Sequence, residues 1–131
     1  MDSNAEGDVV AHVEFVNSYD ESMCRVGLLP MEEVRSFRLT ANVDRYAAVL
    51  SLPLQTIENL GLLGITAFHG EAELLSVPAQ KLYGPVTVQC KGRSIFALAA
   101  VSPEGAPAML GRSSLQALGL DGTCFNSDAP V

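Results

Sequence analysis

The chain has 131 residues, of which 48% are hydrophobic, and a formal net charge of −7 with 15 acidic side chains. This length and apolar content predict one folded domain with a substantial core. With more acidic than basic residues, the chain lacks the cluster of lysines and arginines that binds phosphate groups, which argues against a nucleic-acid partner. No apolar stretch approaches the roughly 20 residues of a transmembrane helix, which argues against a membrane span.

The two ends of the chain set the predicted domain limits. Residues 1–7 are acidic and polar and predict a tail, residues 8–125 form the predicted domain, and residues 126–131 form a second tail. The first residues lack the basic flank and apolar core of a signal peptide, so a cytoplasmic location is the default expectation.

The body of the chain is predicted to be mainly β. Alternating or short apolar runs predict strands, in chain order, at Val9–Val16, Glu33–Val43, Ile65–Phe68, Leu74–Val77, Val86–Cys90, Ser94–Ser102 and Met109–Gly111. Residues 17–30 are polar and carry glycine and proline, so they predict a loop, and we expect Leu28 and Leu29 to tuck under the body. Lys91-Gly92-Arg93 predicts a compact hairpin turn.

Two short helices are predicted, one in each half of the chain. The first covers Leu52–Leu62, where Pro53 suits the first helical position and Gly61 suits the end. The second covers Ser113–Leu118, with Ser113 as its cap. Both end in the letters Leu-Gly-Leu, and this echo predicts a duplicated half-unit. Many short strands with two short helices predict a mainly β closed barrel.

Asp44 is the candidate functional acid. It lies between the apolar segments Phe37–Val43 and Ala47–Leu52 and is the only acidic residue between Glu33 and Glu58. A carboxylate near buried surface can have its pKa shifted by desolvation and neighbouring charge, which suits an acid used in chemistry. An aspartate at such a place also serves to close a hydrogen-bonded turn. The spacing leaves both interpretations open.

No metal or cofactor is expected. The cysteines Cys24, Cys90 and Cys124 lack CxxC spacing, so we expect buried free thiols and neither a disulfide framework nor a zinc site. His12 and His69 have no metal-ligand spacing to a cysteine or a carboxylate.

Two segments resemble the signature of retropepsin-like aspartic proteases, namely Val43-Asp44-x-x-Ala47-x-Val49-Leu50-Ser51-Leu52-Pro53 and Met109-Leu110-Gly111-Arg112. The likeness is to the small single-domain bacterial members and covers about residues 8–120, including Gly84-Pro85-Val86. It implies a closed barrel of two pseudo-twofold half-units, with Asp44 as the catalytic acid. It also implies structural roles for Leu110, Gly111 and Arg112.

The same resemblance implies a groove for an extended peptide. Its expected lining is Arg45, Tyr46 and Ala47, together with Leu74 and Leu75 from a flap at residues 72–76. That segment has no glycine near its tip, whereas the family's flap is a glycine-bearing hairpin.

The family's Asp-Thr-Gly triplet is replaced here by Asp44-Arg45-Tyr46. Aspartic proteolysis needs two carboxylates that share a proton, so one such acid per chain implies a homodimer with both Asp44 residues at its dyad. Tyr46 is expected to crowd the turn or point into the groove, because it carries a Cβ and a large ring. Arg45, if paired with Asp44, would hold both carboxylates as anions. Ala48 stands where many members carry the aspartate that pairs with Arg112.

Two functions follow as hypotheses. The first is a non-catalytic homodimeric module of aspartic-protease fold that binds a peptide or protein or serves in assembly. The second is an active homodimeric aspartic endopeptidase using Asp44 from each subunit. We expect the dimer to pair its terminal segments, with Thr123–Phe125 as a candidate strand, so truncation at Asp121 should lower the mass in solution. A different role on another β fold stays open.

Overall fold

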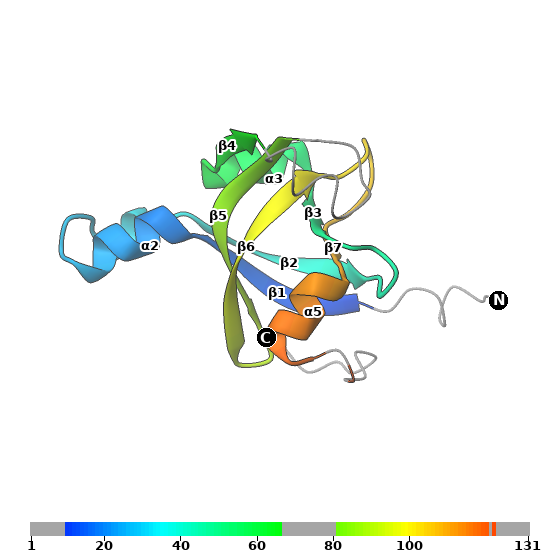
Figure 1. Cartoon of the computed structure of the whole chain (residues 1–131). Helices are drawn as coiled ribbons and strands as arrows, with labels where there is room; N and C mark the ends of the chain where they lie inside the picture. Colours follow the sequence, from blue (N-terminus) through cyan, green and yellow to red (C-terminus); the bar gives the residue numbers. More distant parts are fainter. Residues whose placement is uncertain (1–9, 67–80, 121, 123–131) are drawn as a thin grey trace.

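A computed structural model of the chain describes residues 10–66, 81–120 and 122 (Figure 1). The elements in chain order are β1 (Val10–Asn17), α2 (Ser18–Arg25), the 3-10 helix η1 (Met31–Glu33), β2 (Ser36–Val43), β3 (Leu50–Leu52), α3 (Leu54–Leu60), β4 (Leu63–Thr66), β5 (Lys81–Cys90), β6 (Arg93–Val101), β7 (Met109–Leu110) and α5 (Arg112–Leu118). The prediction of a mainly β chain with short helices is confirmed.

Six strands close into a barrel. They are hydrogen-bonded in the order β1-β2-β7-β3-β6-β5, and the second half of β5 pairs back with β1 through Val86–Gln89. β4 lies outside this ring, paired with the first half of β5. The predicted closed barrel is therefore confirmed, and its closure satisfies the backbone groups that an open sheet would expose at its edges.

Apolar side chains from the strands and from α3 and α5 fill the barrel. In β1 the predicted alternation holds, because Ala11, Val13 and Phe15 are buried and His12 is exposed. The helices contribute Ile57 and Leu115, each almost fully buried. Burial of each large side chain contributes about 1.5–3 kcal/mol, so the core is the main source of the barrel's stability.

The barrel consists of two interlocked half-units, which confirms the predicted duplication. The first half-unit is β2, a loop, β3 and α3; the second is β6, a loop, β7 and α5. β2 runs parallel to β7 and β3 runs parallel to β6, while Ser51 of β3 pairs antiparallel with Met109 of β7. Exchanging the halves therefore preserves the pairing pattern, as a pseudo-twofold axis near Ser51 and Met109 requires.

The two helices of the half-units end in the same way. Gly61 and Gly119 adopt left-handed conformations with φ of 67° and 73° at the ends of α3 and α5. The next residues, Leu62 and Leu120, donate backbone hydrogen bonds to Ile57 and Leu115. This is the glycine-terminated helix end that the Leu-Gly-Leu echo predicts.

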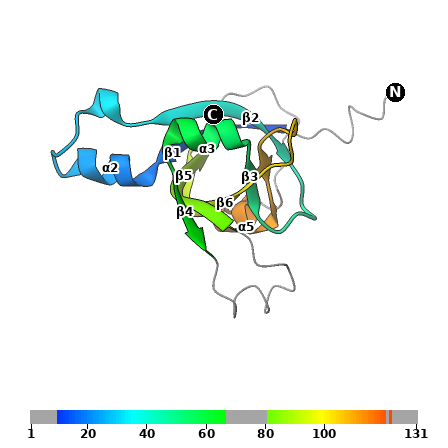
Figure 2. The same ribbon diagram turned by 90° about the horizontal axis from the view of Figure 1, so that it is seen from above.

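The main departure from the predicted fold is an arm formed by α2 and η1, which projects from the side of the barrel (Figure 2). Residues 17–30 were predicted as a loop, and this is wrong for Ser18–Arg25. The helix begins because the Asn17 side chain accepts the Asp20 N–H (3.0 Å). Leu28 is 69% exposed, so it does not tuck under the body, whereas Leu29 is half-buried.

Buried polar contacts attach the arm to the barrel. Asp20 is 5% exposed and accepts three hydrogen bonds from Arg35, from N (3.1 Å), Nε (2.7 Å) and Nη2 (3.0 Å). The Asn17 amide donates to the Leu60 carbonyl at the end of α3 (2.7 Å). Ser18 Oγ hydrogen-bonds to Thr87 Oγ1 on β5 (2.8 Å). These bonds fix the base of the arm to two separate parts of the barrel.

Several predicted boundaries shift by a few residues. The second strand starts at Ser36, because Met31–Glu33 form η1. The first helix starts at Leu54 with Pro53 at the N-cap, after residues that form β3. Ser113 is not a cap, because α5 starts at Arg112 with Gly111 in the N-cap position.

The predictions for the hairpin turn, the cysteines and two further strands have different outcomes. The hairpin turn at Lys91 and Gly92 is confirmed, with φ of 50° and 77°. Cys24 and Cys90 are free, and Cys90 is buried as expected, but Cys24 is only half-buried. The predicted strand Leu74–Val77 and the predicted dimer strand Thr123–Phe125 lie outside the described residues.

Candidate functional site

The loop after β2 holds Asp44 against the second half-unit. The Asp44 N–H donates to the Leu110 carbonyl of β7 (3.0 Å), and the Asp44 carbonyl accepts the Ala47 N–H (3.2 Å). Its carboxylate Oδ1 accepts the Tyr46 N–H (2.9 Å). Asp44 is half-buried and closes a hydrogen-bonded turn, which is one of the two interpretations that its spacing left open.

Tyr46 does not crowd this turn. Lys91 is the one non-glycine residue in the described part of the chain with a positive φ, so the backbone at Tyr46 does not require glycine. Tyr46 is 95% exposed. Of the two alternatives expected for Tyr46, crowding of the turn does not occur, and the exposed ring instead lines the open hollow at this loop.

Gly111 allows the second half-unit to approach the Asp44 loop closely. A Cβ at this position would lie 2.6 Å from the Val49 carbonyl oxygen and 2.8 Å from that of Ala47. The φ of −89° is ordinary, so the requirement for glycine is space and not backbone conformation. Directly after it, the Arg112 N–H donates to the Ala47 carbonyl (2.7 Å). The loop of the first half-unit is thus hydrogen-bonded to the start of α5.

An open hollow of about 540 Å³ lies at this loop, lined by Asn42, Val43, Asp44, Arg45, Tyr46 and Met109. Its described lining holds one carboxylate and one guanidinium. The sequence named Asp44, Arg45 and Tyr46 as site residues. Val43 and Met109 stood in the two signature segments without a role in the site, and Asn42 was not named. Asn42 and Met109 are brought together because they are register partners in the parallel pairing of β2 and β7.

Ser102 takes the place of Asp44 in the second half-unit. The offset that relates Gly61 to Gly119 also relates Asp44 to Ser102. The Ser102 N–H donates to the Leu52 carbonyl (2.8 Å), as the Asp44 N–H donates to Leu110. The Ser102 hydroxyl donates to the Pro107 carbonyl (3.2 Å). Each chain therefore places one acid, Asp44, at the point where its two half-units meet. A reaction that needs two carboxylates sharing one proton would need a second chain.

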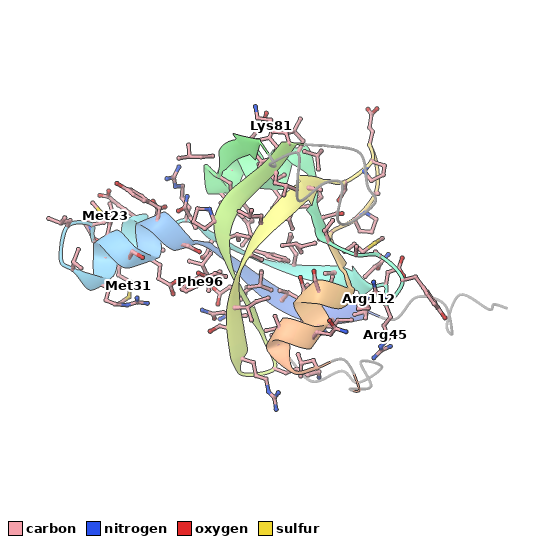
Figure 3. All side chains as sticks on the ribbon, viewed as in Figure 1. Met23, Met31, Arg45, Lys81, Phe96 and Arg112 are labelled. Atoms are coloured by element: carbon pink, nitrogen blue, oxygen red, sulfur yellow. The ribbon has the colours of Figure 1, made fainter. Side chains whose placement is uncertain are left out.

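The remaining predicted site residues are distributed as follows. Leu110 is fully buried in the core. Arg45 and Arg112 are exposed and lie on the same side of the barrel (Figure 3). An ion pair between Asp44 and Arg45 stays a prediction. Leu74 and Leu75 lie outside the described residues.

Residues 10–66 and 81–120 give little support to a metal site, a membrane-spanning helix or a reactive thiol. No three histidine, cysteine or acidic side chains in this part gather as metal ligands. No helix described there is long and apolar enough to cross a membrane. Burial raises the pKa of the Cys90 thiol, which keeps the thiol protonated and makes it a poor nucleophile.

Comparison of the sequence with protein-family models and with curated proteins gives no match to either.

Proposed function

We propose that this chain is a retropepsin-like module. In this proposal two copies meet at their Asp44 loops, and the homodimer binds a peptide or protein segment, or serves in assembly, with impaired or absent catalysis. A cytoplasmic location remains part of the proposal.

The proposal rests on the place where the loops of the two half-units meet. Asp44 lies at the loop end of one half-unit and Ser102 at the corresponding place of the other, and both loops are tied by equivalent backbone bonds. A second copy would supply the second acid. A 95% exposed tyrosine beside an open hollow adds support, because exposed aromatic side chains are enriched at binding surfaces.

Two features favour impaired catalysis. The Asp44 carboxylate already accepts the Tyr46 N–H within its own turn. Arg45 adds a positive charge next to the acid, and two symmetry-related copies of that charge near one axis would repel each other unless each is neutralised.

The second candidate is an active homodimeric aspartic endopeptidase that uses Asp44 from each subunit. The observation in its favour is that Tyr46 leaves the turn unstrained and points into solvent. The loss of glycine at this position is therefore not by itself a barrier to the backbone geometry of the loop.

The dimer contact is tested by the mass in solution of the wild-type chain and of Tyr46→Glu. We expect a dimer for the wild type and a shift toward monomer for Tyr46→Glu, because two carboxylates would face each other across the axis. Phe96→Glu is the matched control, since Phe96 is also exposed (71%) but lies on the outer side of β6. A wild-type monomer, or equal masses for wild type and Tyr46→Glu, would refute the Asp44-loop dimer.

A further inference from the structure

The start of α5 lies directly beside the loop that carries Asp44. The Arg112 N–H donates to the Ala47 carbonyl (2.7 Å), and the Ser113 N–H donates to the Ala48 carbonyl (3.3 Å). The loop and the helix therefore form one continuous surface, which we name the loop–helix surface. Its exposed residues are Arg45, Tyr46, Ala48, Arg112 and Ser113.

The loop–helix surface is locally positive in an acidic chain. Arg45 and Arg112 lie on the same side of the barrel (Figure 3) and are two of the chain's eight basic side chains. Residues 44–49 and α5 together carry one acid, Asp44, which is half-buried and accepts the Tyr46 N–H. Two positive charges and one negative charge give a local charge of about +1, whereas the whole chain carries −7. At physiological salt the Debye length is about 8 Å, so a ligand on this surface interacts mainly with the nearby charges.

The hollow beside these arginines offers contacts to apolar groups. Val43, Met109 and Tyr46 are part of its lining, and its volume of about 540 Å³ lies within the range of ligand sites. Tyrosine and arginine are also the residue types enriched at binding surfaces. Apolar contacts flanked by arginines suit a peptide in which carboxylates stand beside an apolar side chain. Two arginines are too few for the row of phosphate contacts that holds a nucleic acid.

We infer that the loop–helix surface binds an acidic peptide segment. An apolar side chain of the segment enters the hollow, and carboxylates next to it in the segment contact Arg45 and Arg112. A guanidinium group binds a carboxylate through two parallel N–H bonds, so arginine suits this class of partner. The inference rests on the proposed function, because it names the class of segment that the same loop binds.

An acidic segment also favours the proposed dimer. Two copies that meet at their Asp44 loops bring both copies of Arg45, Arg112 and Asp44 near one axis, with a summed charge of about +2. Carboxylates of the bound segment neutralise this charge and reduce the repulsion between the copies. A ligand that binds the dimer more tightly than the monomer shifts the equilibrium toward the dimer.

Fluorescence anisotropy with a labelled peptide, in which glutamates flank a leucine, tests the ligand class on the full-length wild-type chain. We expect this peptide to bind and its counterpart, with glutamine in place of each glutamate, to bind at least about tenfold more weakly in Kd. Added salt should weaken the binding of the acidic peptide. Equal binding of the two peptides, or no binding of the acidic one, overturns the inference.

Arg112→Gln tests whether the loop–helix surface is the binding site. It should weaken the binding of the acidic peptide at least about threefold, and Arg112→Lys should keep part of the affinity because it keeps the charge. Arg25→Gln is the matched control, because Arg25 is exposed on the arm, away from the Asp44 loop (Figure 1), and its loss changes the net charge equally. Equal losses for Arg112→Gln and Arg25→Gln contradict the assigned surface. A single-stranded oligonucleotide that binds as tightly as the acidic peptide overturns the assignment to a peptide.

The mass in solution separates this inference from the proposed function. Failure of the proposed function appears as equal masses for wild type and Tyr46→Glu. Failure of the inference appears as peptide binding that depends neither on the glutamates nor on Arg112. Where both hold, the acidic peptide should raise the mass of the wild type toward that of a dimer more than the glutamine peptide does. Equal effects of the two peptides on the mass contradict the inference.

Discussion

Asp20→Asn removes the charge that holds the base of the arm while keeping the shape of the side chain. The Asp20 carboxylate is 5% exposed and accepts three hydrogen bonds from Arg35. Asparagine retains one oxygen acceptor and turns an NH2 group toward the guanidinium, which has only donors. At least one of the three hydrogen bonds is lost, together with the ion pair.

The expected loss follows from these contacts. A hydrogen bond to a charged group contributes about 1.5–3 kcal/mol, and breaking a buried ion pair costs about 3–5 kcal/mol. The Arg35 side chain is 50% exposed, so water solvates it again after the change and reduces the cost. We expect the free energy of unfolding to fall by about 2 kcal/mol, which lowers the Tm by roughly 5–10 °C in a chain of this size.

Urea denaturation at neutral pH measures this difference, with Glu32→Gln as the control. Glu32 is an exposed acid on the same arm, so its loss changes the net charge equally and should change stability by less than about 0.5 kcal/mol. If Asp20→Asn destabilises no more than Glu32→Gln, the arm is not held by this carboxylate.

The pH dependence gives a further check on the same variant. Hydrogen bonds from Arg35 lower the pKa of Asp20 in the folded chain, against the opposing effect of burial. The group therefore contributes stability that is fully present above the unfolded-state value of about 3.9 and is lost as pH falls through the folded value. The difference between wild type and Asp20→Asn should be constant at neutral pH and shrink below about pH 4. A difference that grows in acid would contradict this assignment.

Two further substitutions test the crossing of the half-units and the cap of α2. Gly111→Ala should lower the free energy of unfolding, measured by thermal denaturation, by about 2–4 kcal/mol, because the added Cβ would meet two backbone carbonyls. Gly122→Ala is the control: Gly122 has open space around it, so the substitution should cost under about 1 kcal/mol in the same measurement. Asn17→Ala should cost about 2–3 kcal/mol, because it removes the cap of α2 and leaves the Leu60 carbonyl without its amide donor. A loss below about 0.5 kcal/mol for either would refute its stated role.

Local patterns in the sequence were enough to predict the barrel class and the two helix ends. Alternation identified β1 and β2, and the Leu-Gly-Leu letters marked the ends of α3 and α5. The pairing of β2 with β7 and of β3 with β6 joins residues far apart in the chain. No local signal specifies that pairing, so the hollow beside Asp44 could not be predicted from local patterns.

The arm shows why a local prediction can fail. Asn17 followed by Asp20 and Glu21 is a helix-start signal that could have been recognised. The helix is short, however, and an isolated helix of this length is marginal in water. Asp20 bonded to Arg35 and Ser18 bonded to Thr87 hold it in place, and both contacts are set by the fold.

Tyr46 illustrates the same limit at the candidate site. A family pattern with glycine at this position suggested a strained turn. The turn that forms uses the Asp44 carboxylate as acceptor and leaves Tyr46 unstrained. The sequence left a turn-closing role for Asp44 open beside a chemical one, and it did not specify which turn forms.

Cleavage of a diverse peptide library, from acid to neutral pH, tests the central claim of impaired catalysis most directly. Asp44→Asn is a suitable comparison, because the asparagine Oδ1 can still accept the Tyr46 N–H and the fold should be unchanged. The account predicts that the folded wild type shows no cleavage that depends on Asp44, so wild type and Asp44→Asn should give the same result. Cleavage by the wild type that is lost in Asp44→Asn would contradict it and establish the chain as an active aspartic endopeptidase.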